Sequence, residues 1–238
     1  MEKMKDFVVI GLGRFGKSIA TELYAQGHEV LAIDKNQAET NHINGKVSSA
    51  VTADATSYNI LHSLGVQNFD CAIICIGEEL EPSLLAVEVC KELKLKYIIA
   101  KAKSEEHAKI LYALGVDQVI FPENFAGKKL ANMLSNPGIN ELVDLTGDYK
   151  IFEMPLPNQW NDKTIREINM TKKYKVSIVV IKRNNEALSP DPDITLLDGD
   201  RLVLAGQSSK LKTLVNLIEE PEEINYSLAS VFGLTDEK

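Results

Sequence analysis

The chain has 238 residues, 45% of them hydrophobic and 25% charged, with a formal net charge of -8. This length and composition suffice for one large hydrophobic core or two modest ones. The acidic balance argues against nucleic acid or anionic lipid as a direct partner, because both require a basic face. No apolar run approaches the roughly 20 residues of a membrane span, and the first residues lack the apolar core of a signal peptide. We therefore expect a cytoplasmic protein.

The first half of the chain alternates short apolar runs, rich in Val, Ile and Ala, with helical patterns. Several of the helical patterns end at a glycine, as helices do where a left-handed C-terminal position is needed: Gly27, Gly65 and Gly115. This alternation predicts an α/β fold with a Rossmann-type, doubly wound parallel sheet covered on both faces. The predicted strands are 7–11, 29–34, 49–54, 71–77, 97–102 and 118–123, and the predicted helices are 16–27, 36–45, 57–65, 80–94 and 104–115.

The alternation stops near Ser135, where Pro137, Gly138 and Gly147 follow one another closely. Beyond them the pattern predicts a smaller α+β domain. The C-terminal tail is either loosely held or docks as a helix on a neighbouring subunit. In the second domain we predict strands at 149–156, 175–183, 186–190 and 200–207 and short helices near 163–169 and 208–220. The predicted segments are a nucleotide-binding domain 1–135, a hinge or linker 136–147, a second domain 148–220 and a tail 221–238.

The stretch VVIGLGRFGKSIA has glycines in the G-x-G-x-x-G spacing, after a predicted strand and at the start of a predicted helix. Gly11 permits a sharp turn out of the strand, Gly13 lets the backbone approach a pyrophosphate, and Gly16 allows close packing of helix on strand. The helix that begins near Arg14 directs its free N–H groups and its dipole at the phosphates. The stretch therefore predicts a dinucleotide-binding loop.

Four further residues lie at predicted strand ends, where ligands bind in open parallel sheets. Asp34 is placed to accept hydrogen bonds from ribose hydroxyls and to repel a 2′-phosphate, which favours NAD over NADP; the alternative is a cap on the next helix. Asp54 is read either as a hydrogen-bond partner of adenine or as a helix cap. Gly77 would let the chain pass under a ring, and Lys101 is either a phosphate ligand or a solvated lysine.

A nicotinamide-dependent dehydrogenase needs an acid–base group beside the ring, and none is evident. The four histidines, His28, His42, His62 and His107, all fall in helices or connections of the first domain. The second domain has no histidine, no cysteine and no glycine-framed serine. The three cysteines of the chain are read as core thiols. We therefore predict that the protein acts by binding a nucleotide and catalyses no reaction of it. A small NAD-dependent oxidoreductase is the alternative function.

Several motifs together resemble the cytosolic RCK (regulator of K+ conductance, or KTN) subunits of Ktr and Trk potassium uptake systems, and KtrA-like members above all. They are GLGRFGKS, AIDKN, ADAT, FDCAIICIGEELEPS, AKA and ALGVDQVIFPE, with KYKVSIVVIKRNNEALSPDPDITLLDGDRLVLAG in the second domain. The resemblance covers the chain up to about residue 218, so that the two domains correspond to TrkA-N and TrkA-C domains.

The resemblance implies a non-enzymatic regulatory subunit. Such proteins form homodimers that build an octameric ring, bind ATP, ADP or NAD(H), and gate an integral-membrane potassium-translocating subunit of the KtrB/TrkH type at the inner face of the membrane. It also implies that Arg14 reaches a phosphate group. In ATP-bound relatives this phosphate belongs to the nucleotide of the dimer partner. Some hydroxyacid dehydrogenases also carry Arg at this position. The residues expected at the nucleotide are Gly11, Leu12, Gly13, Arg14, Phe15, Gly16, Asp34, Lys35, Asp54, Ala55, Ile76, Gly77 and Lys101.

Two further ligands follow from the resemblance. Glu123 matches an acid that helps to bind a cation, such as Mg2+, near the phosphates; capping of the helix that starts there is the alternative. Ktr-type relatives can also bind cyclic di-AMP in the second domain, with an Arg shortly before a Tyr-Gly pair. The aligned residues here are Thr171 and Lys175, a departure that weakens this expectation. The apolar wall for that ligand is retained as Ile168, Ile178 and Pro190.

Overall fold

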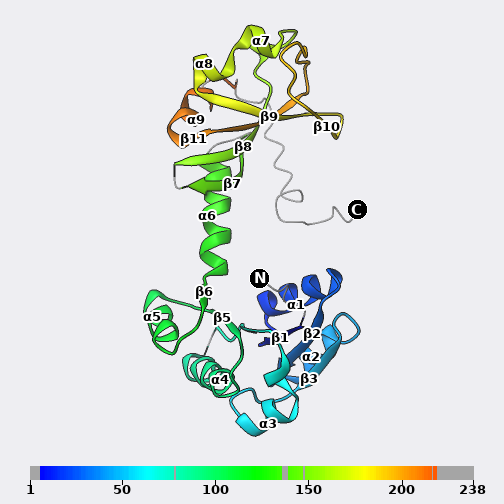
Figure 1. Ribbon diagram of the computed structural model, residues 1–238, viewed down its shortest axis with the longest axis vertical. Helices are drawn as coiled ribbons and strands as arrows, with labels where there is room; N and C mark the ends of the chain where they lie inside the picture. Colours follow the sequence, from blue (N-terminus) through cyan, green and yellow to red (C-terminus); the bar gives the residue numbers. More distant parts are fainter. Residues whose placement is uncertain (1–5, 78, 136–138, 147, 216, 219–238) are drawn as a thin grey trace. The chain divides into compact units, whose positions relative to one another are not determined.

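Figure 1 shows the computed structural model, which describes residues 6–77, 79–135, 139–146, 148–215 and 217–218. The chain divides into two compact units, one ending at Phe125 and the other beginning at Ala126. This division falls inside helix α6 (Pro122–Ser135). The predicted tail, 221–238, lies outside the described residues, and the domain boundaries expected from the sequence remain a proposal.

The first unit is built on a six-stranded parallel sheet with the order β3-β2-β1-β4-β5-β6. The order runs outward from β1 on one side and from β4 on the other, so the topological switch point lies between these two strands. The predicted Rossmann-type sheet and its six strands are confirmed. The strands are β1 (Asp6–Ile10), β2 (Glu29–Asp34), β3 (Ser49–Thr52), β4 (Cys71–Ile74), β5 (Tyr97–Lys101) and β6 (Gln118–Ile120).

Helices cover both faces of this sheet. Alternate residues of each strand face opposite sides, so Val8 and Ile10 belong to a core shared with α3, α4 and α5, whereas Val9 belongs to a core shared with α1 and α2. Burial on both faces explains why the strands read as continuous apolar runs. The helices are α1 (Arg14–Ala25), α2 (Gln37–Ile43), α3 (Tyr58–Ser63), the short 3-10 helix η1 (Val66–Asn68), α4 (Leu80–Glu92) and α5 (Glu105–Ala113).

The second unit contains an antiparallel five-stranded sheet with the order β10-β9-β11-β8-β7. Its core includes Phe152, Met154, Trp160, Leu202 and Leu204, all buried. The predicted smaller α+β domain is confirmed. Its elements are β7 (Asn140–Thr146), β8 (Tyr149–Pro155), the 3-10 helix η2 (Asn158–Trp160), α7 (Ile165–Ile168), α8 (Met170–Tyr174), β9 (Val176–Arg183), β10 (Glu186–Leu188), β11 (Arg201–Gln207) and α9 (Ser208–Val215).

The segment 136–147, predicted as a hinge or linker, contains the strand β7, which the sequence analysis missed. The strand pairs with β8, and its register shifts twice along the pairing. Pro137, Gly138 and Gly147, on which the linker prediction rested, lie outside the described residues. A strand that depends on a neighbour for its pairing carries a weak local signal, so the proline and glycine residues around it dominated the interpretation.

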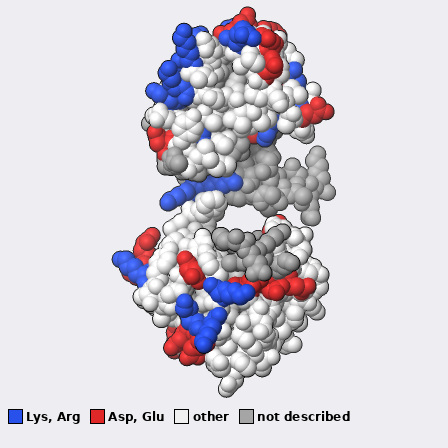
Figure 2. Space-filling view, viewed as in Figure 1, with Lys and Arg blue, Asp and Glu red and all other residues white. Residues whose placement is uncertain are grey.

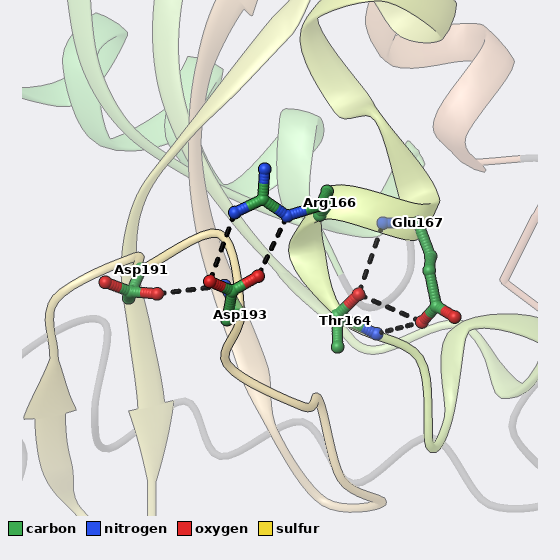
Figure 3. Close-up of polar contacts among 5 residues, drawn as sticks. All are labelled: Thr164, Arg166, Glu167, Asp191 and Asp193. Carbon is green, nitrogen blue, oxygen red and sulfur yellow. Dashed lines mark hydrogen bonds and ion pairs between the residues drawn. The ribbon is translucent and has the colours of Figure 1, made fainter.

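Ionic contacts fasten the loops of the second unit. Arg166 of α7 donates from Nε and Nη2 to the two carboxylate oxygens of Asp193, at 2.8 and 3.1 Å (Figure 3). Asp191 accepts a hydrogen bond from the backbone N–H of Asp193, and Thr164 and Glu167 form a capping box at the start of α7 (Figure 3). These contacts tie the loop that follows β10 to α7.

A buried carboxylate anchors the loop before β11. Arg183 of β9 donates from Nε and Nη2 to the two carboxylate oxygens of Asp200, both at 2.7 Å. The Leu197 N–H donates to the same carboxylate at 2.9 Å, and none of the Asp200 side chain is exposed. The hydrogen bonds from Arg183 hold the pKa of Asp200 below its usual value, followed in effect by that from Leu197. The loop is thus held by an ionised group.

We predict that Asp200→Asn lowers the free energy of unfolding of the second unit by about 1–3 kcal/mol at pH 7, because Arg183 loses its anionic partner. The native pKa of Asp200 is depressed, so its contribution is present above about pH 4 and is lost as the pH falls through the native pKa. Urea unfolding followed by the fluorescence of the buried Trp160 measures both effects. The exposed Asp198→Asn is the control, and an equal deficit of Asp200→Asn at pH 7 and pH 3 would contradict the prediction.

Candidate functional site

A cavity of about 730 Å³ opens at the C-terminal ends of the parallel strands, beside the switch point between β1 and β4. It is lined by the loop after β1, by the ends of β2, β3, β4 and β5, and by the start of α6. The structure brings nearly all of the predicted nucleotide-binding residues together here. Those in the lining are Gly11, Gly13, Arg14, Phe15, Gly16, Asp34, Lys35, Asp54, Ala55, Ile76, Gly77 and Lys101, together with Glu123.

The glycine loop is packed too tightly for side chains at two of its positions. A Cβ atom on Gly16 would lie 1.9 Å from the carbonyl oxygen of Gly11, which no rotamer relieves. Gly11 has φ +92°, and a Cβ there would lie 3.0 Å from the backbone of Cys75 and Ile76. Gly13 differs, because a Cβ there would meet no atom within 4 Å. The loop is therefore fixed by Gly11 and Gly16, and it faces open space at Gly13.

Helix α1 begins at this open position. Gly13 is its N-cap residue, no side chain caps the helix, and its first turn contains no acidic residue. The first N–H groups of the helix and the positive end of its dipole are therefore available to an anion in the cavity. Arg14 is exposed at the same place and lines the cavity. This arrangement suits a phosphate group.

Asp34 holds the glycine loop against the end of β2. Its Oδ2 accepts a hydrogen bond from the N–H of Leu12 at 2.6 Å, and its Oδ1 accepts one from the N–H of Asn36 at 2.8 Å. The cap of α2 is Asn36, whose side chain accepts from the N–H of Ala38, so the helix-cap alternative for Asp34 is wrong. Leu12 is fully buried and is absent from the lining, so it takes part through its backbone. Asp34 remains the predicted ribose ligand.

Asp54 shapes the turn after β3. Its Oδ1 accepts hydrogen bonds from the N–H and the hydroxyl of Thr56, at 2.9 and 2.7 Å, and these bonds lower its pKa. The N-cap residue of α3 is Ser57, so the helix-cap alternative for Asp54 is wrong. The carboxylate lies in the cavity lining. Contact of Asp54 with adenine stays a prediction.

Two ion pairs lie on the wall of the cavity. Lys35, after β2, donates to Glu79 at 2.9 Å, and both side chains are more than half exposed. This hydrogen bond raises the pKa of Lys35. Lys101, at the end of β5, donates to Glu123 at 2.5 Å, and only 17% of its side chain is exposed. The solvated-lysine alternative for Lys101 is therefore wrong.

Gly77 lines the cavity beside Lys101. A Cβ there would lie 3.2 Å from Cε of Lys101 and 3.4 Å from its Nζ. The absence of a side chain at Gly77 thus leaves room for the stem of Lys101 to pass beside it. The role predicted from the sequence, passage of the chain under a ligand ring, stays a prediction.

Glu123 lies in the first turn of α6 and in the cavity lining, so both interpretations made from the sequence stay open. The hydrogen bond from Lys101 holds its pKa below the usual value. Among the described residues, no group of three or more His, Cys, Asp or Glu is arranged to hold a metal ion. A cation beside Glu123 would therefore need further ligands such as phosphate oxygens, which is consistent with the predicted place of Mg2+.

The sequence analysis missed several residues of the lining. They lie at strand ends or in the connections and helix starts that follow them, where ligands bind in parallel sheets, so this signal was available. They are Ile10, Ile33, Asn36, Glu39, Ala53, Thr56, Cys75, Glu79 and Pro82. Glu39 is paired with Lys17 of α1 at 2.5 Å. In Figure 2 lysines and arginines are interspersed with aspartates and glutamates on the visible face of the first unit.

The cysteines and histidines occupy the places expected of structural residues. Cys71, Cys75 and Cys90 are buried and unpaired, and burial raises the pKa of each thiol to about 12. The prediction of core thiols is confirmed. His107 is also buried, and burial lowers its pKa. The described lining of the cavity contains no histidine.

The residues predicted to contact cyclic di-AMP lie in the second unit. Ile168, at the end of α7, is only 3% exposed and belongs to the core of this unit, so it offers no surface to a ligand in the single chain. Ile178 of β9 is half-buried against the same core, and Pro190 is half-buried in the loop after β10. Thr171 and Lys175 are exposed, within α8 and directly after it. This site stays a prediction.

The fold and the cavity define the class: a nucleotide-binding Rossmann domain followed by a small α+β domain. The family model of the TrkA-N domain matches residues 7–122, and that of the TrkA-C domain matches residues 151–219. The chain belongs to the family of Ktr and Trk potassium uptake regulatory proteins that these two domains define. The family inferred from the sequence motifs is confirmed.

Named relatives match over nearly their whole length. Ktr system potassium uptake protein A of Bacillus subtilis (strain 168) is 39% identical, and the match covers 90% of this chain and 97% of the relative. Ktr system potassium uptake protein C of the same organism is 33% identical, with 85% and 92% covered. The protein A of Vibrio alginolyticus is 31% identical, with 87% and 94% covered. These names agree with a role in potassium uptake.

Solved structures share the fold. The crystal structure of the GsuK RCK domain matches with a TM-score of 0.60 and 21% identity, over 93% of this chain and 49% of that chain. The GsuK channel bound to NAD matches with a TM-score of 0.57 and 21% identity, over 93% and 41%. The chain therefore spans half or less of these structural relatives. In the described part of this chain, no helix is both long and apolar enough to span a bilayer.

We predict that Gly16→Ala destabilises the first unit by about 3 kcal/mol and abolishes the binding of a nucleotide in the cavity, because the added methyl group meets the carbonyl of Gly11. Gly13→Ala is the matched control. It adds the same methyl group in open space, so the melting temperature should change little while nucleotide affinity falls, since the group obstructs the approach of phosphate. Differential scanning calorimetry and titration calorimetry measure the two effects. Full nucleotide affinity in Gly16→Ala would contradict the role of this packing.

Proposed function

We propose that this chain is a cytoplasmic regulatory subunit that binds adenine nucleotide, either ATP and ADP or NAD(H), and gates a membrane potassium-translocating partner. One observation carries the proposal: a cavity with an uncapped helix start and a glycine loop lies in a chain that is 39% identical to a Ktr system potassium uptake protein along 97% of that relative. The cavity supports the proposal of nucleotide binding, and the similarity to this relative supports the proposal that the binding controls potassium uptake.

Different parts of the cavity suit different parts of a nucleotide. The start of α1 and Arg14 would hold phosphates, Asp34 would hold ribose hydroxyls, and the turn at Asp54 and Ala55 would border the base. Lys35, Ile76 and Gly77 complete the proposed wall. Glu123 would help to hold Mg2+ near the phosphates, and the ion would supply positive charge that a polyphosphate needs. The carboxylates of Asp34 and Asp54 disfavour a ligand with a 2′-phosphate.

The proposed mechanism is a population shift. Ligands that bind the same cavity with different affinities for two conformations of the assembly change the balance between those conformations. The assembly would be a homodimer-based octameric ring, attached to the inner face of the cell membrane through a KtrB/TrkH-like partner. No catalytic step is proposed for the chain, and steady turnover of NADH with a substrate would favour the oxidoreductase alternative.

We predict that Arg14→Ala weakens ATP binding about tenfold or more and weakens NAD binding less, because Arg14 would contact the terminal phosphates of ATP by charge-assisted hydrogen bonds. The measurement is a thermal-shift panel of ATP, ADP, NAD and NADH, with and without Mg2+, in which stabilising ligands raise the melting temperature. Lys17→Ala, on the same helix but paired with Glu39, is the control. Equal losses for ATP and NAD would contradict the assignment of Arg14.

The second ligand is tested separately. If cyclic di-AMP binds near Ile178 and Pro190, titration calorimetry of the full chain should show saturable heat at micromolar ligand, and Ile178→Asp should remove it. Asp193→Asn is the control, because it breaks the contact of Arg166 with the loop after β10 and leaves Ile178 unchanged. It shows whether loosening this loop is enough to remove the heat. Absence of heat in the wild-type chain would remove this ligand from the proposal.

A further inference from the structure

The side chain of Lys101 is held in the wall of the cavity. Its stem passes beside Gly77, 17% of the side chain is exposed, and its Nζ donates to Oε1 of Glu123 at 2.5 Å. Lys101 also lines the cavity, so a ligand there can approach the same Nζ. Because a charge-assisted hydrogen bond is a favourable contact for the ammonium group, another anion that reaches Nζ can take the place of Glu123.

Glu123 is not constrained in the same way. Its side chain is 69% exposed, so its carboxylate can leave Lys101 and be solvated by water. The pair is thus asymmetric: the mostly buried side chain of Lys101 stays in the wall of the cavity, whereas the mostly exposed side chain of Glu123 is free to move. Any anionic group of a ligand that reaches Nζ of Lys101 competes directly with Glu123.

The position of Glu123 in the chain gives this competition a consequence. Glu123 lies in the first turn of α6, and the division between the two compact units falls within this helix, after Phe125. Lys101 belongs to β5, in the parallel sheet of the first unit. The ion pair therefore fastens the start of the helix that carries the chain out of the first unit to the wall of the nucleotide cavity.

We propose that Lys101 and Glu123 form an exchangeable ion pair that discriminates between nucleotides by how far their negative charge extends. A ligand that brings a phosphate oxygen to Lys101 displaces Glu123 from Lys101, and where no divalent cation links Glu123 to the phosphates, it also releases the start of α6. A ligand whose charge ends at a pyrophosphate on the glycine loop leaves the pair in place. The inference rests on the proposed function and deepens it, because it names the residues that distinguish ATP from NAD.

The second ion pair of the cavity provides a matched control. Lys35 and Glu79 are 68% and 58% exposed, so neither side chain needs the other for solvation. Glu79 precedes α4, which lies wholly within the first unit. Glu79→Gln therefore removes one negative charge from the same cavity, as Glu123→Gln does, without touching Lys101 or α6.

The test is titration calorimetry of the full chain with ATP and with NAD, in EDTA so that no divalent cation links Glu123 to phosphate. We expect Glu123→Gln to raise ATP affinity about two- to fivefold, the range of a partly exposed ion pair, and to leave NAD affinity unchanged. Lys101→Met keeps the apolar stem and should lower ATP affinity about tenfold or more. The double variant should equal Lys101→Met alone, because the effect of Glu123 acts through Lys101.

Specific outcomes would overturn the inference. A gain from Glu123→Gln that persists beside Lys101→Met, or an equal gain from Glu79→Gln, would show a general electrostatic effect. A wild-type chain that binds neither nucleotide would overturn the proposed function as well, so the two failures are distinguishable. Melting temperatures check the folding of each variant, with Lys101→Gln as the substitute if Lys101→Met does not fold.

Hydrogen exchange over residues 125–135 supplies a second readout. In EDTA, ATP should accelerate exchange in this part of α6 of the wild-type chain relative to NAD, because the start of the helix has lost its contact with Lys101. In Lys101→Met the two nucleotides should give the same exchange. Identical exchange with ATP and NAD in the wild-type chain would overturn the release of α6.

Discussion

The close approach of the Gly16 backbone to the carbonyl of Gly11 is the constraint on which the candidate site depends. A side chain at Gly16 would lie 1.9 Å from that carbonyl, so β1 and α1 can approach this closely only with glycine there. The approach places the uncapped start of α1 at the switch point of the sheet. Asp34 then fixes the loop from the other side through the N–H of Leu12. The geometry that suits a phosphate is therefore a consequence of backbone packing.

The remaining wall of the cavity is organised by charge. Five carboxylates and three basic side chains line it, and the ion pairs Lys35–Glu79 and Lys101–Glu123 join residues from different strand ends and helix starts. Both side chains of the first pair are more than half exposed, whereas the Lys101 side chain of the second is mostly buried. The first pair therefore contributes little to stability. The second pair fixes its lysine in the cavity wall and connects the cavity to the start of α6.

Much of the first unit follows from local patterns. The glycine spacing, Asp34 and the strand-end residues were identified because parallel strands end at one edge of the sheet, and the cavity contains them. Pairwise contacts could not be predicted in this way. The packing of Lys101 on Gly77, its bond to Glu123, and the turn that Asp54 forms with Thr56 all depend on side-chain directions that spacing does not specify.

The sequence by itself determined the Rossmann-type sheet, the family and the edge of the sheet at which a nucleotide would bind, because periodicity and glycine positions are local properties of the chain. Only the tertiary structure decided that β7 forms within the predicted linker, that Ile168 belongs to a core, and that Lys101 is held by Glu123. Strand pairing, burial and ion pairing join residues distant in sequence, and packing alone brings such residues together.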